Sequence, residues 1–260
     1  MKSLKLMLGI ISTAILFSCG NNSTQKTSSD SSSGNNSSVT TSGSGDDTYI
    51  EMSNNTTGAN MQISGSTKIY LSASGKARHE MTMLVNGKPS THIVAIGDVS
   101  HPFTSTVLDD SAKTYYTNVV DTSELGKFSS QKKITVTKIG EEKIAGFNCV
   151  HAQIIANSSF GKMAGMFNMT DTTDLWLSSE VPMPDADKKF MNLASQQMAS
   201  VMGDKSVGTQ LQQMGCVGFP IKFQLRSKTT SSITQVSKIS KANFPASMFE
   251  IPAGYKKTDG

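Results

Sequence analysis

The chain has 260 residues, 17% of them charged, and 24 Lys and Arg against 20 Asp and Glu give a formal net charge of +4. This small charge, without a basic run, excludes the electrostatic footprint of a nucleic-acid-binding protein. The length allows one large domain or two small ones. No run of about 18 apolar residues is present, so the sequence predicts no membrane-spanning helix.

The N-terminal segment is typical of a bacterial lipoprotein signal. Lys2 and Lys5 precede an apolar region at residues 6–17, which is too short to span a bilayer but suits a signal peptide. Ser18 then stands directly before Cys19, which resembles a lipobox, in which the cysteine is acylated and becomes the mature N-terminus. We predict residues 1–18 as the signal peptide and Cys19 as the site of lipidation, including palmitate. An ordinary secretory signal with a chance cysteine is the alternative.

Acyl chains on Cys19 would anchor the protein through its N-terminus. Each buried methylene contributes roughly 0.8 kcal/mol, so two or three chains hold a protein at a membrane without a spanning helix. Gly20 rather than Asp after the cysteine favours the outer membrane, and residues 20–25 lack the acidic residues that send some lipoproteins to the cell surface. We expect a lipid-anchored, periplasm-facing monomer at the bacterial outer membrane, with the cell surface as the alternative.

A serine-rich segment follows the cysteine. Residues 20–47 hold ten serines, no aromatic residue and Val39 as their one aliphatic residue. Such a composition cannot bury enough apolar surface to offset the entropy of ordering. We predict a disordered tether over residues 19–47, with a reach on the order of 30 Å, and a folded domain over residues 48–260. A low-complexity binding tract is the alternative for the tether.

Short alternating segments begin after residue 49. Apolar and polar side chains alternate at residues 81–85, 92–96, 134–136, 175–177 and 221–226. This period of two indicates antiparallel strands with one buried face. Turn signals lie between these segments, at Asn86-Gly87, Gly97-Asp98, Asp109-Asp110, Gly140 and Ala145-Gly146.

One segment has helical periodicity instead. Its apolar residues fall at i, i+3, i+4, i+8, i+11 and i+12, with Asp185 as the expected N-cap and Gly203 as the expected stop. These residues are Phe190, Leu193, Ala194, Met198, Val201 and Met202. One long amphipathic helix among many strands predicts an α+β fold, with the helix packed on one face of an antiparallel sheet.

Four short motifs carry a resemblance to a known family. The sequences DDSAKTY, KIAGFNC, GFPIK and FEIPAGY occur in this order, beginning at residues 109, 143, 218 and 249. So ordered, they resemble a family of bacterial secreted lipoproteins with a domain of unknown function, similar to the lipoprotein-carrier (LolA/LolB-like) fold. The resemblance covers residues 49–256 and implies a strongly curved antiparallel half-barrel, closed by helices around an apolar cavity. It supplies no functional residue, and residues 161–169 depart from it as an insertion.

The sequence offers little catalytic chemistry. It has no Gly-x-Ser-x-Gly elbow, no phosphate-binding loop and no Cys-x-x-Cys motif. His79-Glu80 begins like a zinc-binding helix, but Met83 stands where the second histidine is required. Cys149 and His151 share one face of a strand, yet two ligands do not make a metal site, and a half-buried histidine beside a structural cysteine is favoured. We expect no enzyme activity, no cofactor and no metal, with an undetected hydrolase as the third alternative.

Methionine is abundant, since 13 of the 15 methionines follow the signal segment. The clusters Met163, Met166, Met169 and Met191, Met198, Met202 suit a plastic core, an adaptable ligand lining or, least of all, copper(I). The leading hypothesis is an apolar, lipid-like ligand or an envelope partner bound in the half-barrel. The alternative is a structural or interaction module with a filled core. The predicted cavity residues are Phe190, Leu193, Met198, Val201 and Met202.

Two cysteines remain once Cys19 is acylated. An exported chain folds where disulfides persist, so we predict a Cys149–Cys216 disulfide. The loop of about 67 residues that it closes would contribute about 4 kcal/mol in the chain-entropy model. Two separate buried thiols are the alternative.

Overall fold

The computed structural model describes residues 44–58, 61–101, 103–119, 132–159, 168–185, 187–188 and 206–259. The described elements in chain order are β1 (Asp47–Gly58), β2 (Met61–Leu71), β3 (Lys76–Val85), β4 (Lys88–Asp98), β5 (Thr104–Asp109), β6 (Thr114–Val119), β7 (Lys132–Ile144), β8 (Phe147–Ser159), β9 (Asn168–Ser178), α4 (Ser206–Gln213), β10 (Phe219–Arg226), β11 (Thr230–Ala242), the 3-10 helix η3 (Ala246–Phe249) and β12 (Lys256–Lys257).

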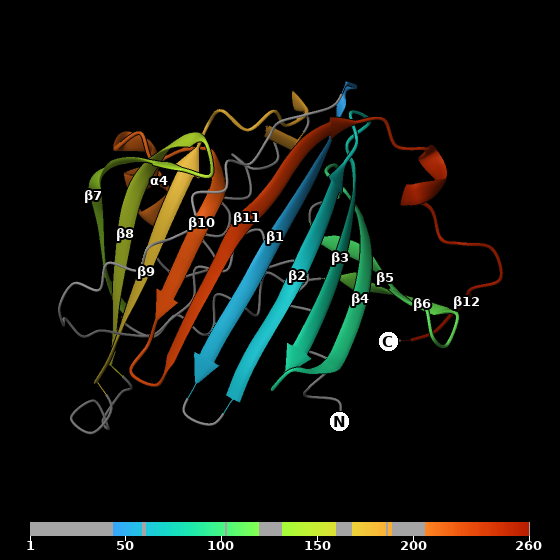
Figure 1. Cartoon of the computed structure of the whole chain (residues 1–260), viewed down its shortest axis with the longest axis horizontal. Coiled ribbons are helices and arrows are strands. Elements are labelled where there is room, and N and C mark those ends of the chain that lie inside the picture. Colours follow the sequence, from blue (N-terminus) through green and yellow to red (C-terminus); the bar gives the residue numbers. More distant parts are fainter. Residues whose placement is uncertain are drawn as a thin grey trace.

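All the described strands belong to one sheet (Figure 1). The strand order is β12-β6-β5-β4-β3-β2-β1-β11-β10-β9-β8-β7, so β1 pairs with the distant β11 at the centre. Neighbouring strands are antiparallel, apart from the short parallel pair of β12 and β6. The curved antiparallel sheet expected from the sequence is therefore confirmed.

The first strand begins one residue before the expected start of the domain. The Asp47 carboxylate is buried and accepts hydrogen bonds from the backbone N–H groups of Ala73, at 2.8 Å, and Phe244, at 2.6 Å. These bonds tie the start of β1 to the β2–β3 loop and to the chain after β11.

Two of the five turn signals close tight hairpins. Asn86 and Gly87 join β3 to β4, and Ala145 and Gly146 join β7 to β8, each with positive φ angles. Two consecutive residues of positive φ match the right-handed twist of hairpin strands. The Gly97-Asp98 signal marks the end of β4, where the Asp98 carboxylate accepts a hydrogen bond from the Ser100 N–H at 2.7 Å in the turn that follows. The Gly140 signal is misplaced, since Gly140 lies inside β7. A glycine within a strand gives the same local signal as a glycine in a turn.

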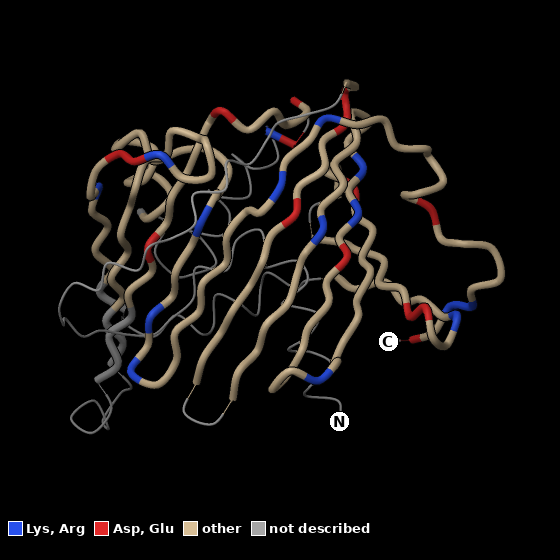
Figure 2. Tube along the Cα trace, in the orientation of Figure 1, with Lys and Arg blue, Asp and Glu red and all other residues tan. Residues whose placement is uncertain are grey.

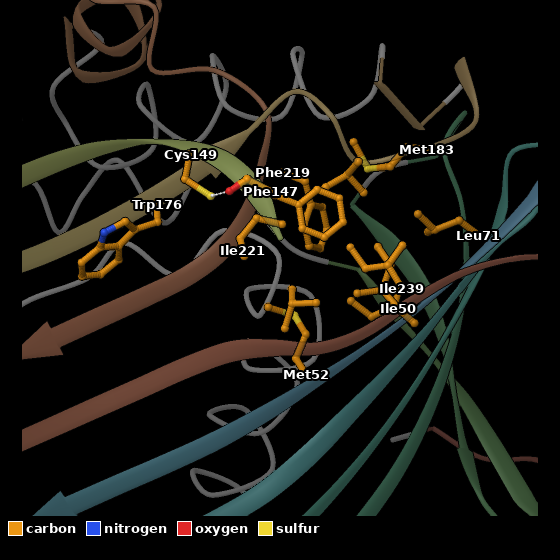
Figure 3. Packing of buried hydrophobic residues seen from close by; sticks show 13 residues of the cluster. Ile50, Met52, Leu71, Phe147, Cys149, Trp176, Met183, Phe219, Ile221 and Ile239 are labelled. Atoms are coloured by element: carbon orange, nitrogen blue, oxygen red, sulfur yellow. Dashed lines mark hydrogen bonds between the residues drawn. The ribbon is translucent and has the colours of Figure 1, made fainter. Parts of the chain in front are cut away.

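The largest core cluster lies on one side of the central strands (Figure 3). Ile50, Ile69 and Ile239 are fully buried and come from the adjacent strands β1, β2 and β11. Phe147, Phe219 and Met183 gather next to these isoleucines in the same cluster. Residues 181–183, which follow β9, therefore pack over the centre of the sheet.

The described helix differs from the expected one. Helix α4 has eight residues, Ser206–Gln213, and packs Val207 and Leu211 against Val136, Ile154 and Leu175 of strands β7 to β9. The long amphipathic helix was predicted just before it, and residues 189–205 lie outside the described residues. No helix in the described part of the chain is long and apolar enough to cross a membrane.

Candidate functional site

Strand alternation and register assign the residues to the two faces of the sheet. The face that carries α4 is called the inner face, and it holds Leu175 of β9 and Phe223 of β10. Phe223 pairs with Thr234, and Thr234 pairs with Asn54, so the inner face continues through β11 to β1. Asp174, which precedes Leu175, lies on the opposite, outer face. Trp176 has the same strand parity, and it also packs into the core cluster of Ile50, Phe147 and Phe219 at the end of the sheet where β10 has a bulge.

The inner face is apolar at the centre of the sheet. The register Ile239–Ile50–Ile69–His79 places four inner-face residues side by side on β11, β1, β2 and β3. Met52 and Val236 continue this surface next to the isoleucines, and both are buried. A ligand held here would meet aliphatic and thioether groups.

Three buried polar atoms on this face have no hydrogen-bond partner among the described residues. They are Asn54 Oδ1, His79 Nδ1 and Ser105 Oγ, and Asp187 Oδ2 is a fourth such atom outside the strands. Ser105 alternates with Val107, which follows His79 and Ala95 across the register of β3, β4 and β5. An unpaired buried polar group costs about 1–3 kcal/mol, so native proteins carry few of them. The described part of the inner face therefore holds several polar atoms without hydrogen bonds.

His79 combines a deep position with an inaccessible Nδ1 atom. It lies deep inside the molecule, and burial lowers its pKa from 6.5 to about 4, so it is neutral at pH 7. The residue nevertheless keeps partial accessible surface, although its Nδ1 is inaccessible.

The outer face carries a polar cluster in which the buried carboxylate has several hydrogen-bond donors. Asp174 is 2% exposed, and its carboxylate accepts hydrogen bonds from Arg226, from Gln153 Nε2 at 3.0 Å and from His151 Nε2 at 2.9 Å. These four residues come from the adjacent strands β8, β9 and β10, so the buried negative charge has donors on both sides. We call these four residues, together with Trp176, Lys222 and Glu142, the Asp174 cluster.

Trp176 forms the apolar part of the Asp174 cluster. The His151 ring stacks on the indole at a centroid distance of 4.3 Å, and Lys222 Nζ lies 4.2 Å from the ring centroid. The indole N–H donates to Glu142, whose carboxylate also lies 3.8 Å from His151 Nδ1. Sequence reasoning named His151 and missed its partners, because the pairing of β8 with β9 and β10 is needed to bring them together.

The Asp174 cluster does not form a recognisable catalytic or metal site. No hydroxyl or thiol in the described part of the chain is hydrogen-bonded to His151, so the His151–Asp174 pair has no nucleophile to activate. Among the described residues, no group of three or more His, Cys, Asp and Glu side chains is placed to hold a metal ion. Acidic and basic residues are interspersed along the sheet (Figure 2).

Both cysteines of the described chain are free and buried, so the predicted Cys149–Cys216 disulfide is not formed in the structure. Cys149 Sγ lies 3.5 Å from the carbonyl O of Phe147, and Cys216 Sγ lies 3.9 Å from that of Met214. Burial raises the pKa of both thiols, that of Cys149 to about 11. Each thiol is directed at the backbone of its own segment and stays protonated at neutral pH.

Several residues singled out from the sequence lie outside the described residues. They are the lipidation residue Cys19, the cavity candidates Phe190, Leu193, Met198, Val201 and Met202, and Met163, Met166 and Met191. The roles expected for them stay predictions.

The motifs in the C-terminal two thirds of the sequence are matched by a family profile. DUF4412, a domain of unknown function, matches residues 50–255. The chain belongs to the DUF4412 family. The predicted membership of a family with a domain of unknown function is thereby confirmed. Among curated proteins, none matches the sequence significantly.

Solved structures of bacterial proteins are similar to the DUF4412 chain at low identity. The lipoprotein LppX from Mycobacterium tuberculosis is 12% identical, with 75% of this chain and 88% of that chain covered and a TM-score of 0.34. A LolA superfamily protein from Nitrosomonas europaea is 6% identical, with coverages of 78% and 90% and a TM-score of 0.35. LprF from Mycobacterium bovis is 12% identical, with coverages of 79% and 90% and a TM-score of 0.31.

Proposed function

We propose that this protein is a non-enzymatic lipoprotein that binds an apolar, lipid-like ligand against the inner face of its sheet. The observation that carries this proposal is the composition of that face. Its centre is aliphatic, yet it holds the unpartnered polar atoms of Asn54, His79 and Ser105. A lipid supplies both an apolar chain and a few polar oxygens, so it complements such a surface.

The proposed anchor sets where this binding takes place. Acylation of Cys19 and a periplasm-facing position at the outer membrane would keep the sheet beside a source of lipid. Cells fed labelled palmitate should incorporate label into the wild-type protein and not into the Cys19→Ala variant. An unlabelled wild-type protein would contradict the anchor while leaving the ligand proposal intact.

Ligand binding is tested on the chain from residue 20 onward, which contains every described element. After mild purification, we expect mass spectrometry to detect extractable lipid at a substantial fraction of the protein concentration. We also expect an uncharged naphthylamine fluorophore to bind with micromolar affinity or better. A lipid-free protein that does not bind the fluorophore would favour the alternative, a structural or interaction module with a filled core.

A further inference from the structure

The two ends of the sheet differ in how their edge strands resist pairing with another chain. The described sheet ends at β7 on one side and at β12, next to β6, on the other. Six of the 13 residues of β7 are Lys or Glu, and a bulge lies between Lys138 and Gly140. Charged side chains and bulges both discourage edge-to-edge pairing, so β7 is a poor template for a further strand.

Strand β6 has neither of these features. Its sequence, TYYTNV, contains no charged residue, proline or glycine, and it is rich in Tyr, Thr and Val, which favour strands. Thr117 and Val119 are exposed, Val119 by 65%. A six-residue segment of this composition pairs readily with other chains when it forms the edge of a sheet.

The C-terminal segment covers the edge of β6. The Lys256 N–H donates to the carbonyl O of Lys113 at 3.0 Å, and the Thr258 N–H donates to that of Tyr115 at 2.8 Å. We call residues 255–258 the C-terminal clasp. Its strand, β12, consists of two exposed lysines, so this side of the sheet ends in a very short and charged strand.

Tyr255 fastens the C-terminal clasp to the turn between β5 and β6. Its hydroxyl donates to the Asp110 carboxylate, and Lys113 Nζ lies 5.2 Å from the centroid of its ring. Asp109 shapes the same turn by accepting a hydrogen bond from the Ser111 N–H at 3.0 Å. The motifs DDSAKTY and FEIPAGY therefore meet in space, although they lie far apart in the sequence.

An exposed connection joins the C-terminal clasp to the rest of the fold. Helix η3 is held on β3, where Arg78 Nη1 donates to the carbonyl O of Met248 at 3.2 Å, and Phe249 is buried. Residues 250–254 are all exposed, and this stretch runs outward between η3 and β12 (Figure 1). The clasp can therefore be removed without disturbing the packing of η3.

We infer that the C-terminal clasp keeps the protein monomeric by occupying the edge of β6, and that the partner it excludes is β6 of a second copy. Without the clasp, the carbonyl groups of Lys113 and Tyr115 lose their donors, and another strand supplies them. Two uncharged β6 strands related by a two-fold axis present the same groups to each other, with no charges in opposition. This role does not depend on the proposed ligand.

Size-exclusion chromatography with light scattering tests this role on the chain from residue 20 onward. The wild-type protein should be a monomer at high micromolar concentration, and a chain that ends at Gly254 should form dimers or larger species. Lys256→Pro should have the same effect, because proline lacks the N–H that donates to Lys113. Lys257→Pro is the matched control and should stay monomeric, because Lys256 and Thr258 provide the two bonds to β6.

A charge introduced into β6 shows whether the copies associate through this strand. Thr117→Lys in the chain that ends at Gly254 should restore the monomer, because the two lysines would repel each other across a β6–β6 pair. Ile139→Lys, at the exposed bulge of β7, is the control and should leave the association unchanged. The fluorescence of Trp176, the single tryptophan, reports whether each variant is folded.

Monomeric Lys256→Pro and truncated proteins would overturn the inference, as would a wild-type protein that associates to the same extent. Association that persists in the Thr117→Lys chain would also overturn it, and loss of association in Ile139→Lys would place the contact at β7. Should the truncated chain unfold, the comparison of Lys256→Pro with Lys257→Pro decides, and equal association of these two variants would count against the clasp.

Discussion

His79 and His151 lie on opposite faces of the same sheet and differ in what surrounds them. On the outer face, His151 stacks on Trp176 and shares the Asp174 carboxylate with Arg226 and Gln153. On the inner face, His79 Nδ1 has no hydrogen-bond partner among the described residues. The outer-face histidine belongs to a hydrogen-bond network in which each member has a partner. The inner-face histidine has no such network among the described residues.

This difference separates polar residues that stabilise the fold from polar residues that lack a hydrogen-bond partner. A buried charge with several donors makes the register of β8, β9 and β10 specific, because removing one partner leaves the others unpaired. A buried neutral group without a partner lowers stability and gains its hydrogen bond when something else supplies one. The Asp174 cluster therefore stabilises the fold, and the inner face is where we propose that a ligand binds.

The largest expected effect is the pH dependence of stability that His79 produces. The pKa of His79 is about 4 in the folded protein and 6.5 in the unfolded chain, so between these values the unfolded chain binds the extra proton. Stability from this group is complete above pH 6.5 and falls by on the order of 3 kcal/mol as the pH drops to 4. Urea denaturation at several pH values should show this loss.

The His79→Phe variant isolates the contribution of His79 to the pH dependence of stability. Asp187 also titrates in this range, because burial raises its pKa to about 7, and its effect on stability has the opposite sign. That effect is common to both proteins, so the difference between wild type and His79→Phe reports His79. Parallel pH profiles for the two proteins would show that His79 is freely solvated.

Removing the Asp174 carboxylate should break the finished network. Asp174→Ala leaves Arg226, Gln153 and His151 without their shared acceptor, and we expect a loss of about 2–3 kcal/mol in the free energy of unfolding. Thermal denaturation measures the effect. Glu141→Ala is the control, because the Glu141–Lys138 pair is exposed and its loss should leave the midpoint unchanged.

The same variant sharpens the functional comparison. Binding of the fluorophore should be unchanged in the folded Asp174→Ala protein, because Asp174 lies on the face away from the proposed ligand. A stable Asp174→Ala protein that has lost binding would move the functional site to the outer face.

Sequence reasoning predicted strands where one face is apolar and the other polar. Residues 221–226 alternate clearly, and they form most of β10. Strand β1 escaped this reasoning, because its second half is rich in Ser, Asn and Thr, as a loop would be. Pairing with β2 on one side and β11 on the other orders this segment, and such pairing is a long-range property that local composition does not contain.

The candidate site was less predictable than the strands. His79 entered only as an incomplete zinc-binding motif. Its significance depends on the register that places His79, Ala95 and Val107 side by side on β3, β4 and β5. Neither the periodicity of one strand nor the type of one residue specifies that alignment.

The smallest expected effect on the free energy of unfolding comes from removing single hydroxyl groups. One of the two hydroxyls has no hydrogen-bond partner among the described residues, and the other has one. Ser105 Oγ has none among the described residues, whereas Thr48 Oγ1 donates to the carbonyl O of Pro182 at 2.5 Å. Ser105→Ala should be neutral or stabilising by up to about 1 kcal/mol in the ligand-free protein, because it removes an unpaired polar atom. Thr48→Val should be destabilising by about 1 kcal/mol, because it leaves the partly buried carbonyl O of Pro182 without this donor. Urea denaturation with a shared m-value measures both changes. A Ser105→Ala variant destabilised as much as Thr48→Val would mean that Ser105 already has a partner within the protein, and the inner face would then hold one unpartnered polar atom fewer.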